Sequence, residues 1–149
     1  MLKIMIETPY SCPCGSGLTF AECCRQVHSN HTKATTAEAL MRARYSAFAV
    51  GNIDFLYNTF HPTTRRFQHR DAIQQWAQEN KWMQLNILKA TSSTVEFEAH
   101  YLDSALQVQI HHEKSTFKQQ GDLWYYVDGR VVSFDQSAKP SRTYKAPTR

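Results

Sequence analysis

The chain has 149 residues, of which 42% are apolar and 20% are charged, a balance typical of one soluble globular domain with short appendages. It contains no internal repeat, low-complexity tract or apolar run of about 18 residues, which excludes solenoid, fibrous and membrane-spanning classes. The whole net charge of +4 lies in residues 136–149, which we expect to be a disordered basic tail: Lys139, Arg142, Lys145 and Arg149.

Four cysteines fall within thirteen residues near the start of the chain: Cys12, Cys14, Cys23 and Cys24. The eight residues between the two pairs contain a Gly-Ser-Gly turn, so the chain can fold back and gather four sulfurs around one point. Four thiolates about 2.3 Å from a common centre are the ligands of structural zinc. A complete shell of this kind leaves no position for water or substrate, so the spacing predicts a Zn²⁺ ion that holds structure and performs no chemistry.

The alternative for these cysteines is a pair of disulfides, which needs an oxidising compartment. The first residues, before Glu7, include too few apolar side chains for the hydrophobic region of a signal peptide. We therefore expect a cytoplasmic protein in which the four thiols stay reduced and bind metal.

The cysteine segment resembles the SEC-C zinc motif at every ligand position, because it reads Cys-x-Cys, eight residues, then Cys-Cys. The resemblance implies that residues 10–25 bind zinc and form a docking surface for another protein. A polar linker, residues 25–34, follows this zinc knuckle.

Helices are predicted next. Thr35 to Glu38 form a capping-box signature, and the helix that follows ends at Gly51. Asn52 is placed to cap a short second helix that extends to about Phe60, before His61 and Pro62 interrupt it. A third helix is predicted over 71–82, with Ile73, Trp76, Ala77 and Asn80 on one face.

Strands follow the helices. Residues 95–102 alternate apolar and polar side chains, as a half-buried strand does. Asp103 and Ser104 turn the chain into a long strand over 105–117, and a second turn leads into a strand over 123–129. We expect the inward face of the long strand to change between Val108/Ile110 and Phe117, which indicates a bulge. Helices followed by an antiparallel meander define an α+β fold, with helices covering one face of a bent sheet.

A second resemblance covers residues 10 to about 130. Leu40–Phe48, Asp54-Phe-Leu, Phe60-His-Pro and Trp124–Gly129 resemble the bacterial YchJ-like family. The resemblance implies a SEC-C motif joined to an NTF2-like (cystatin-type) cone over residues 34–135, of unassigned biochemical function. It also implies a homodimer through the sheet as one candidate assembly. Unlike many members, this chain has no second SEC-C motif, since its tail contains no cysteine.

Five residues are candidates for lining a pocket in the cone: Arg44, Tyr45, His61, Trp124 and Asp128. Arg44 lies on the predicted buried face of the first helix, where a guanidinium needs acceptors, and the candidates are Asp128, Glu113 and Asp54. Arg44 then either ties the helix to the sheet or anchors an anion inside the cone. His61 either acts as a general base or caps a helix before Pro62. We assign no catalytic residue.

Three functions remain open from the sequence. The first is a zinc-containing adaptor without enzymatic activity that binds another protein through the knuckle. The second is small-molecule binding or a lyase or isomerase activity that uses the cone. The third is nucleic-acid binding through the knuckle and tail, which the near-neutral folded body does not favour. We expect no membrane partner.

Overall fold

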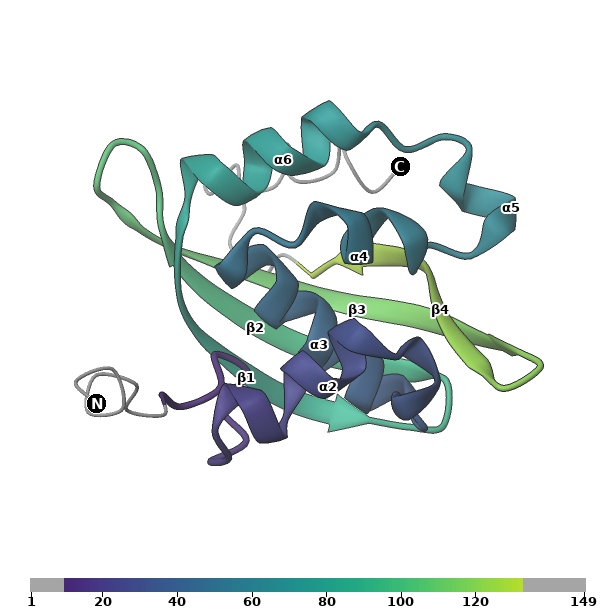
Figure 1. Cartoon of the computed structure of the whole chain (residues 1–149). Coiled ribbons are helices and arrows are strands. Elements are labelled where there is room, and N and C mark those ends of the chain that lie inside the picture. Colours follow the sequence, from purple (N-terminus) through teal and green to yellow (C-terminus); the bar gives the residue numbers. More distant parts are fainter. Residues whose placement is uncertain (1–9, 133–149) are drawn as a thin grey trace.

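The structure, a computed structural model, describes residues 10–132, and the predicted basic tail lies outside the described residues. Helices precede a four-stranded antiparallel sheet of order β1-β2-β3-β4, which confirms the predicted α+β class (Figure 1). The elements are η1 (Phe20–Glu22), α2 (Cys24–Ser29), η2 (His31–Lys33), α3 (Ala37–Val50), α4 (Ile53–Asn58), α5 (Pro62–Arg65), α6 (Arg70–Glu79), β1 (Lys81–Ala90), β2 (Thr94–Leu102), β3 (Val108–Gln120) and β4 (Leu123–Val131). Within this part of the chain, no helix has the length and apolar character needed to cross a membrane.

Helix α3 begins and ends where the sequence predicts. The Thr36 hydroxyl accepts a hydrogen bond from the Ala39 N–H at 3.0 Å, which satisfies one of the first free donors of the helix. Gly51 ends the helix with a φ of 77°, a left-handed conformation that glycine adopts at little cost. The face of α3 that contains Leu40, Met41 and Arg44 is buried against the sheet and the neighbouring helices.

The next two helices are shorter than predicted. Asn52 caps α4 through its side chain, as expected, but the helix ends at Asn58. The reason is that Phe60 forms a parallel bridge with Tyr126 of β4. Helix α6 ends at Glu79, because Asn80 is extended and Trp82 already pairs with Tyr101 in the sheet.

The long strand β3 runs over Val108–Gln120, later than predicted, and its inward face does not change along its length. His111, Glu113, Ser115 and Phe117 are buried, whereas Val108 and Ile110 are exposed on the outer face. The predicted bulge within β3 is therefore wrong. Between β3 and β4 the irregularity lies in β4, where Thr116 pairs with Asp128 and Phe117 with Tyr126, so that Val127 is the extra residue. Strand β1 has two further register shifts against β2.

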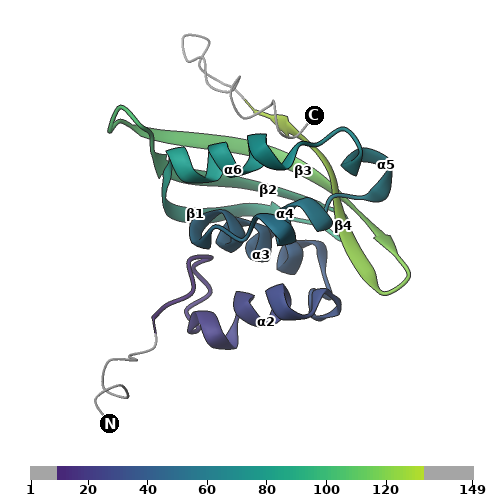
Figure 2. The same ribbon diagram turned by 45° about the horizontal axis from the view of Figure 1, so that its top comes forward.

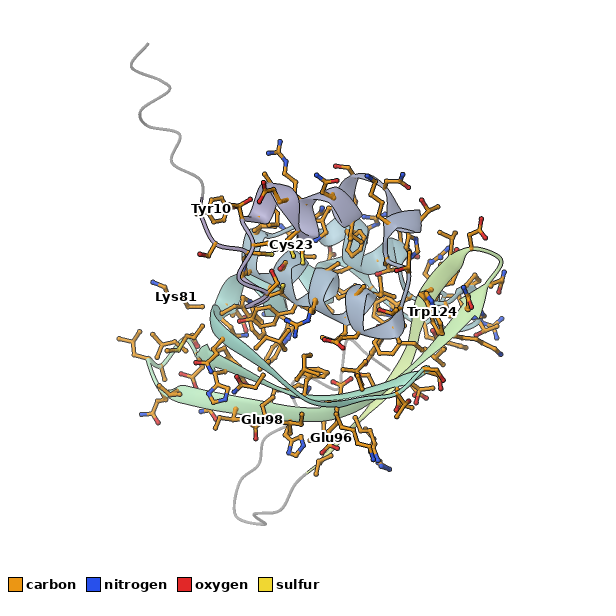
Figure 3. All side chains as sticks on the ribbon, turned by 90° about the horizontal axis from the view of Figure 1, so that it is seen from below. Tyr10, Cys23, Lys81, Glu96, Glu98 and Trp124 are labelled. Atoms are coloured by element: carbon orange, nitrogen blue, oxygen red, sulfur yellow. The ribbon has the colours of Figure 1, made fainter. Side chains whose placement is uncertain are left out.

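The helices lie on one side of a sheet that curves around them (Figures 2 and 3). Both edges of this sheet are partly covered. A Cβ on Gly15 of the cysteine loop would lie 3.8 Å from the carbonyl oxygen of Leu85, so the loop packs against edge strand β1. At the other edge, the Tyr126 N–H and C=O of β4 bond with Thr59 and His61. Covered edges limit pairing with other strands.

Candidate metal centre

The two cysteine pairs are brought together by a small closed loop. Ser11 and Thr19 form a bridge, and the Cys12 N–H donates to the Leu18 carbonyl at 2.9 Å. Gly15 and Gly17 have positive φ values of 81° and 93°, which let the chain reverse between the pairs. The second pair stands where η1 ends and α2 begins, with Cys24 as the first residue of α2.

The four cysteine sulfurs lie within 4.8 Å of one another. The Sγ–Sγ distance is 3.7 Å between Cys14 and Cys23 and 3.9 Å between Cys23 and Cys24. An ion with four sulfurs at about 2.3 Å in tetrahedral geometry has edges of about 3.8 Å, so the arrangement fits a metal with a complete sulfur shell. The four residues are free cysteines, and these distances are far longer than a disulfide bond of about 2.05 Å.

The sulfurs form hydrogen bonds with nearby hydroxyl groups and with one another. The Ser46 Oγ of α3 lies 3.4 Å from the Cys12 sulfur, and the Ser16 Oγ lies 3.2 Å from that of Cys23. A hydrogen bond from Cys24 lowers the pKa of Cys14 to about 4, and the same bond raises the pKa of Cys24. The site thus favours a thiolate, the form that binds metal, and metal binding displaces the remaining thiol protons.

The cysteine loop and the two short helices after it, α2 and η2, are docked onto the domain by polar contacts to α3 and β4. Arg42 donates to the Cys14 carbonyl at 2.8 Å and to the Glu38 carboxylate at 3.0 Å. The His28 Nε2 lies 2.8 Å from the Ala43 carbonyl oxygen, and the His31 Nε2 lies 2.7 Å from that of Trp124.

The cysteines also belong to the hydrophobic core. Cys12, Cys14 and Cys24 are buried in the same continuous cluster as the apolar side chains of α3 and the sheet. Cys23 is partly exposed at the surface of the knuckle, where Figure 3 labels it. The metal site is therefore an internal part of the domain and not a module on a flexible tether.

The structure places the five residues proposed to line a pocket in different parts of the domain. Arg44 is buried, and it donates to the Leu56 carbonyl at 2.9 Å and to the Thr59 hydroxyl at 2.7 Å. Its guanidinium also stacks between the rings of Phe60 and Tyr126, at 4.5 and 4.4 Å from their centroids.

The other four candidates lie in separate places. Tyr45 lines a cavity of about 20 Å³ under α3 and α6, which is the volume of about one water molecule. His61 caps α5 and lies 3.0 Å from the Gln120 side chain, which favours the capping role over the general-base role. Trp124 donates to the Thr35 carbonyl, and Asp128 is exposed in the strand pair with Thr116.

One buried cluster was missed by sequence reasoning. Glu113 is 1% exposed and takes three hydrogen bonds, from His111 at 2.7 Å and from Ser115 and Tyr126 at 2.6 Å. Burial opposes ionisation of this carboxyl, but the hydrogen bonds, led by that of His111, outweigh it and hold the pKa of Glu113 below its ordinary value. Strict alternation along β3 is the signal that would have placed His111, Glu113 and Ser115 on one inward face.

The fold and the cysteine site together define a class: an NTF2-like α+β domain preceded by a four-cysteine motif. The model of the YchJ middle NTF2-like domain matches residues 36–129, and the SEC-C motif model matches residues 11–26. The chain belongs to the YchJ family, whose relatives are named UPF0225 proteins.

Relatives and solved structures agree with this membership. A UPF0225 protein of Vibrio vulnificus is 40% identical over 136 residues, which cover 87% of this chain and 80% of the relative. A SEC-C motif containing protein from Rhodopseudomonas palustris, solved in solution, has a TM-score of 0.75 and 34% identity, and the match covers 82% of this chain and 98% of that one. A crystal structure of a SEC-C motif containing protein from Psychrobacter arcticus has a TM-score of 0.68 and 29% identity, and the match covers 100% of this chain and 95% of that one.

Proposed function

We propose that the four cysteines hold one structural zinc ion and that the protein is an adaptor, which binds another protein through the surface of its zinc knuckle. The observation that carries the proposal is the closed set of four sulfurs, three of them buried, within 4.8 Å. Four sulfur ligands leave no coordination position for a substrate, so the ion would fix the shape of a surface. Clustered cysteines that serve as metal ligands are typical of a reducing compartment, which supports a cytoplasmic location.

The metal is tested first, by elemental analysis of the purified full-length protein. We expect about one zinc per chain, because a tetrahedral four-sulfur site suits this ion and binds it tightly. Iron bound to sulfur is the other metal chemistry for such a ligand set, and it would give visible absorption. Iron in place of zinc, or less than about a tenth of an equivalent of metal, contradicts the proposal.

The surface of the knuckle offers both apolar and basic contacts. We define the knuckle surface by four exposed residues: Tyr10, Leu18, Arg25 and Lys33. Tyr10 and Leu18 are each more than half exposed, so they offer apolar contact area to a partner. Arg25 and Lys33 line a groove of about 340 Å³ along α2 whose lining includes no carboxylate. A partner segment with both apolar and acidic side chains matches this surface.

The enzymatic alternative has less support. Ligand pockets usually measure about 300–1,000 Å³, whereas the cavity inside the cone measures about 20 Å³. The buried carboxylate next to it is already occupied by hydrogen bonds from its own chain. The nucleic-acid alternative gains little from this groove, because its lining contains only two cations, Arg25 and Lys33.

The partner is tested with surface variants, because cysteine variants would disturb the core. Zinc-loaded wild-type protein and a Leu18→Ser/Arg25→Glu variant are used to capture partners, and any captured protein is purified and titrated against both by calorimetry. We expect at least tenfold weaker binding by the variant. The control is Phe67→Ser, which removes an apolar side chain that is 56% exposed outside the knuckle. Equal binding by all three proteins contradicts the proposed surface.

A further inference from the structure

In the turn between β2 and β3, Leu106 has a backbone conformation and an exposure that are both unusual for leucine. Its φ of 63° lies in the left-handed region, where glycine or asparagine is usual and leucine is strained. Its side chain is also 76% exposed, although leucine is normally buried. A position that breaks two rules at once is a candidate for a role outside the folding of its own chain.

Hydrogen bonds to Asp103 fix the backbone of the turn around Leu106. One carboxylate oxygen of Asp103 accepts from the Ala105 and Gln107 N–H groups, both at 2.9 Å. The other oxygen accepts from the Gln109 side chain at 2.9 Å, and the Leu106 N–H donates to the Asp103 carbonyl at 2.8 Å. These bonds fix the backbone that carries Leu106, so its exposed side chain is presented in a defined position.

A groove of about 620 Å³ lies beside this turn, between the end of α6 and the start of β1. Its apolar lining includes Ala77, Trp82 and Leu102, with Leu106 among the lining residues. Beyond the turn, Val108 and Ile110 of β3 are 60% and 51% exposed on the outer face of the sheet. The exposed side chain of Leu106 thus lies beside a groove whose lining is partly apolar and partly polar.

We propose that this surface binds a second copy of the chain, with Leu106 of each protomer inserted into the groove of its partner. A twofold dimer requires a patch that is complementary to itself, and a patch with both a projection and a groove meets this requirement. Its charges are also self-complementary, because the groove lining contains Lys81 together with Glu79 and Asp103. Figure 3 shows Lys81 projecting outward into solvent.

This inference goes beyond the adaptor proposal and does not depend on it. The β2–β3 turn projects past the end of α6, away from the knuckle formed around α2 (Figures 1 and 2). A dimer through the turn therefore leaves both knuckle surfaces accessible. It also differs from the dimer through the sheet that the family resemblance implies.

The test uses sedimentation equilibrium of the zinc-loaded, full-length protein and of a Leu106→Gly variant. We expect the wild type to approach twice the chain mass of 17.2 kDa as its concentration rises. Leu106→Gly should raise the dimer dissociation constant at least tenfold. Because glycine prefers a positive φ, the variant should unfold at the same temperature or higher, so loss of the dimer cannot be attributed to misfolding.

Charge variants and a control complete the test. Lys81→Glu should also weaken the dimer, because it would face Glu79 and Asp103 of the partner protomer, whereas Lys89→Glu on the same strand should not. A monomer at all concentrations overturns the proposal. So does a dimer whose dissociation constant is unchanged in Leu106→Gly, which would place the interface elsewhere, such as on the outer face of the sheet around Glu96 and Glu98.

Discussion

The hydrogen-bonded carboxylate of Glu113 depends on the absence of a side chain at Gly129. A Cβ at Gly129 would overlap the Glu113 carboxylate and lie 2.6 Å from the Tyr126 hydroxyl. The end of a glutamate side chain can usually move aside at little cost, but this one is buried and is held by three hydrogen bonds. Gly129→Ala must therefore break some of these bonds.

The size of the effect follows from the bonds that share one oxygen. Ser115 and Tyr126 both donate to Glu113 Oε2, the atom that the new Cβ displaces. A hydrogen bond to a charged group contributes about 1.5–3 kcal/mol, so losing both lowers the free energy of unfolding by about 4 kcal/mol. For a chain of this length the Tm should fall by about 10 °C.

The assay is urea and thermal unfolding of the metal-loaded protein, followed by circular dichroism. Gly121→Ala is the matched control, because a Cβ there meets open space. Its only cost is the backbone strain of alanine at a φ of 67°, about 1 kcal/mol. In the double variant Gly129→Ala/Glu113→Ala the steric conflict is gone. Its loss of unfolding free energy should therefore be smaller than the sum of the losses of the two single variants. Equal losses for Gly129→Ala and Gly121→Ala, or full additivity in the double variant, would refute this reasoning.

Three further predictions concern the metal site and the buried carboxylate. Ser46→Ala should weaken zinc binding about tenfold in chelator competition, because the buried hydroxyl contacts the Cys12 sulfur. The control is Ser29→Ala, whose hydroxyl bonds to the Arg25 carbonyl of its own helix and whose loss should leave the zinc affinity unchanged. Equal zinc affinities of the Ser46→Ala variant and the wild type would exclude a role for Ser46. Removing the metal with a chelator should lower the Tm of the whole domain, because three cysteines lie in the common core; an unchanged transition for the sheet would contradict this coupling. The free energy of unfolding should fall as the pH drops below the ordinary glutamate pKa of about 4.3, because the folded-state pKa of Glu113 is lower and its stabilisation is complete only above that range. Glu113 is faced by His111 and Tyr126, and Glu113→Gln should flatten the acid limb of the stability curve; an unchanged limb would assign it to other carboxylates.

Local signals allowed much of the fold to be predicted. The cap at Thr36 and the stop at Gly51 depend on backbone groups within a few residues, so the sequence alone defines them. The end of α6 was misplaced because no glycine follows it and because Trp82 fits the apolar face of a helix as well as that of a strand. The helix ends where it does because Trp82 pairs in the sheet with Tyr101, nineteen residues further along the chain.

The candidate sites differ in the same way. The cysteine cluster depends on spacing within one loop, and the structure places all four sulfurs together. The proposed pocket depended on tertiary packing that spacing does not specify: Arg44 is buried as predicted, but Asp128 is exposed after the bulge in β4. The polar cluster was missed because apolar residues were assumed to face inward, whereas β3 exposes Val108 and Ile110 and buries Glu113.

The buried carboxylate of Glu113 is satisfied by groups of its own chain, so it stabilises the interior of the domain. The apolar side chains of Leu106, Val108 and Ile110 are exposed on the other side of the same strand and its turn, where only another molecule could bury them. The described residues thus combine a satisfied buried carboxylate, four clustered cysteines and exposed apolar side chains. This distribution is why both proposals place its activity in association with other chains rather than in catalysis.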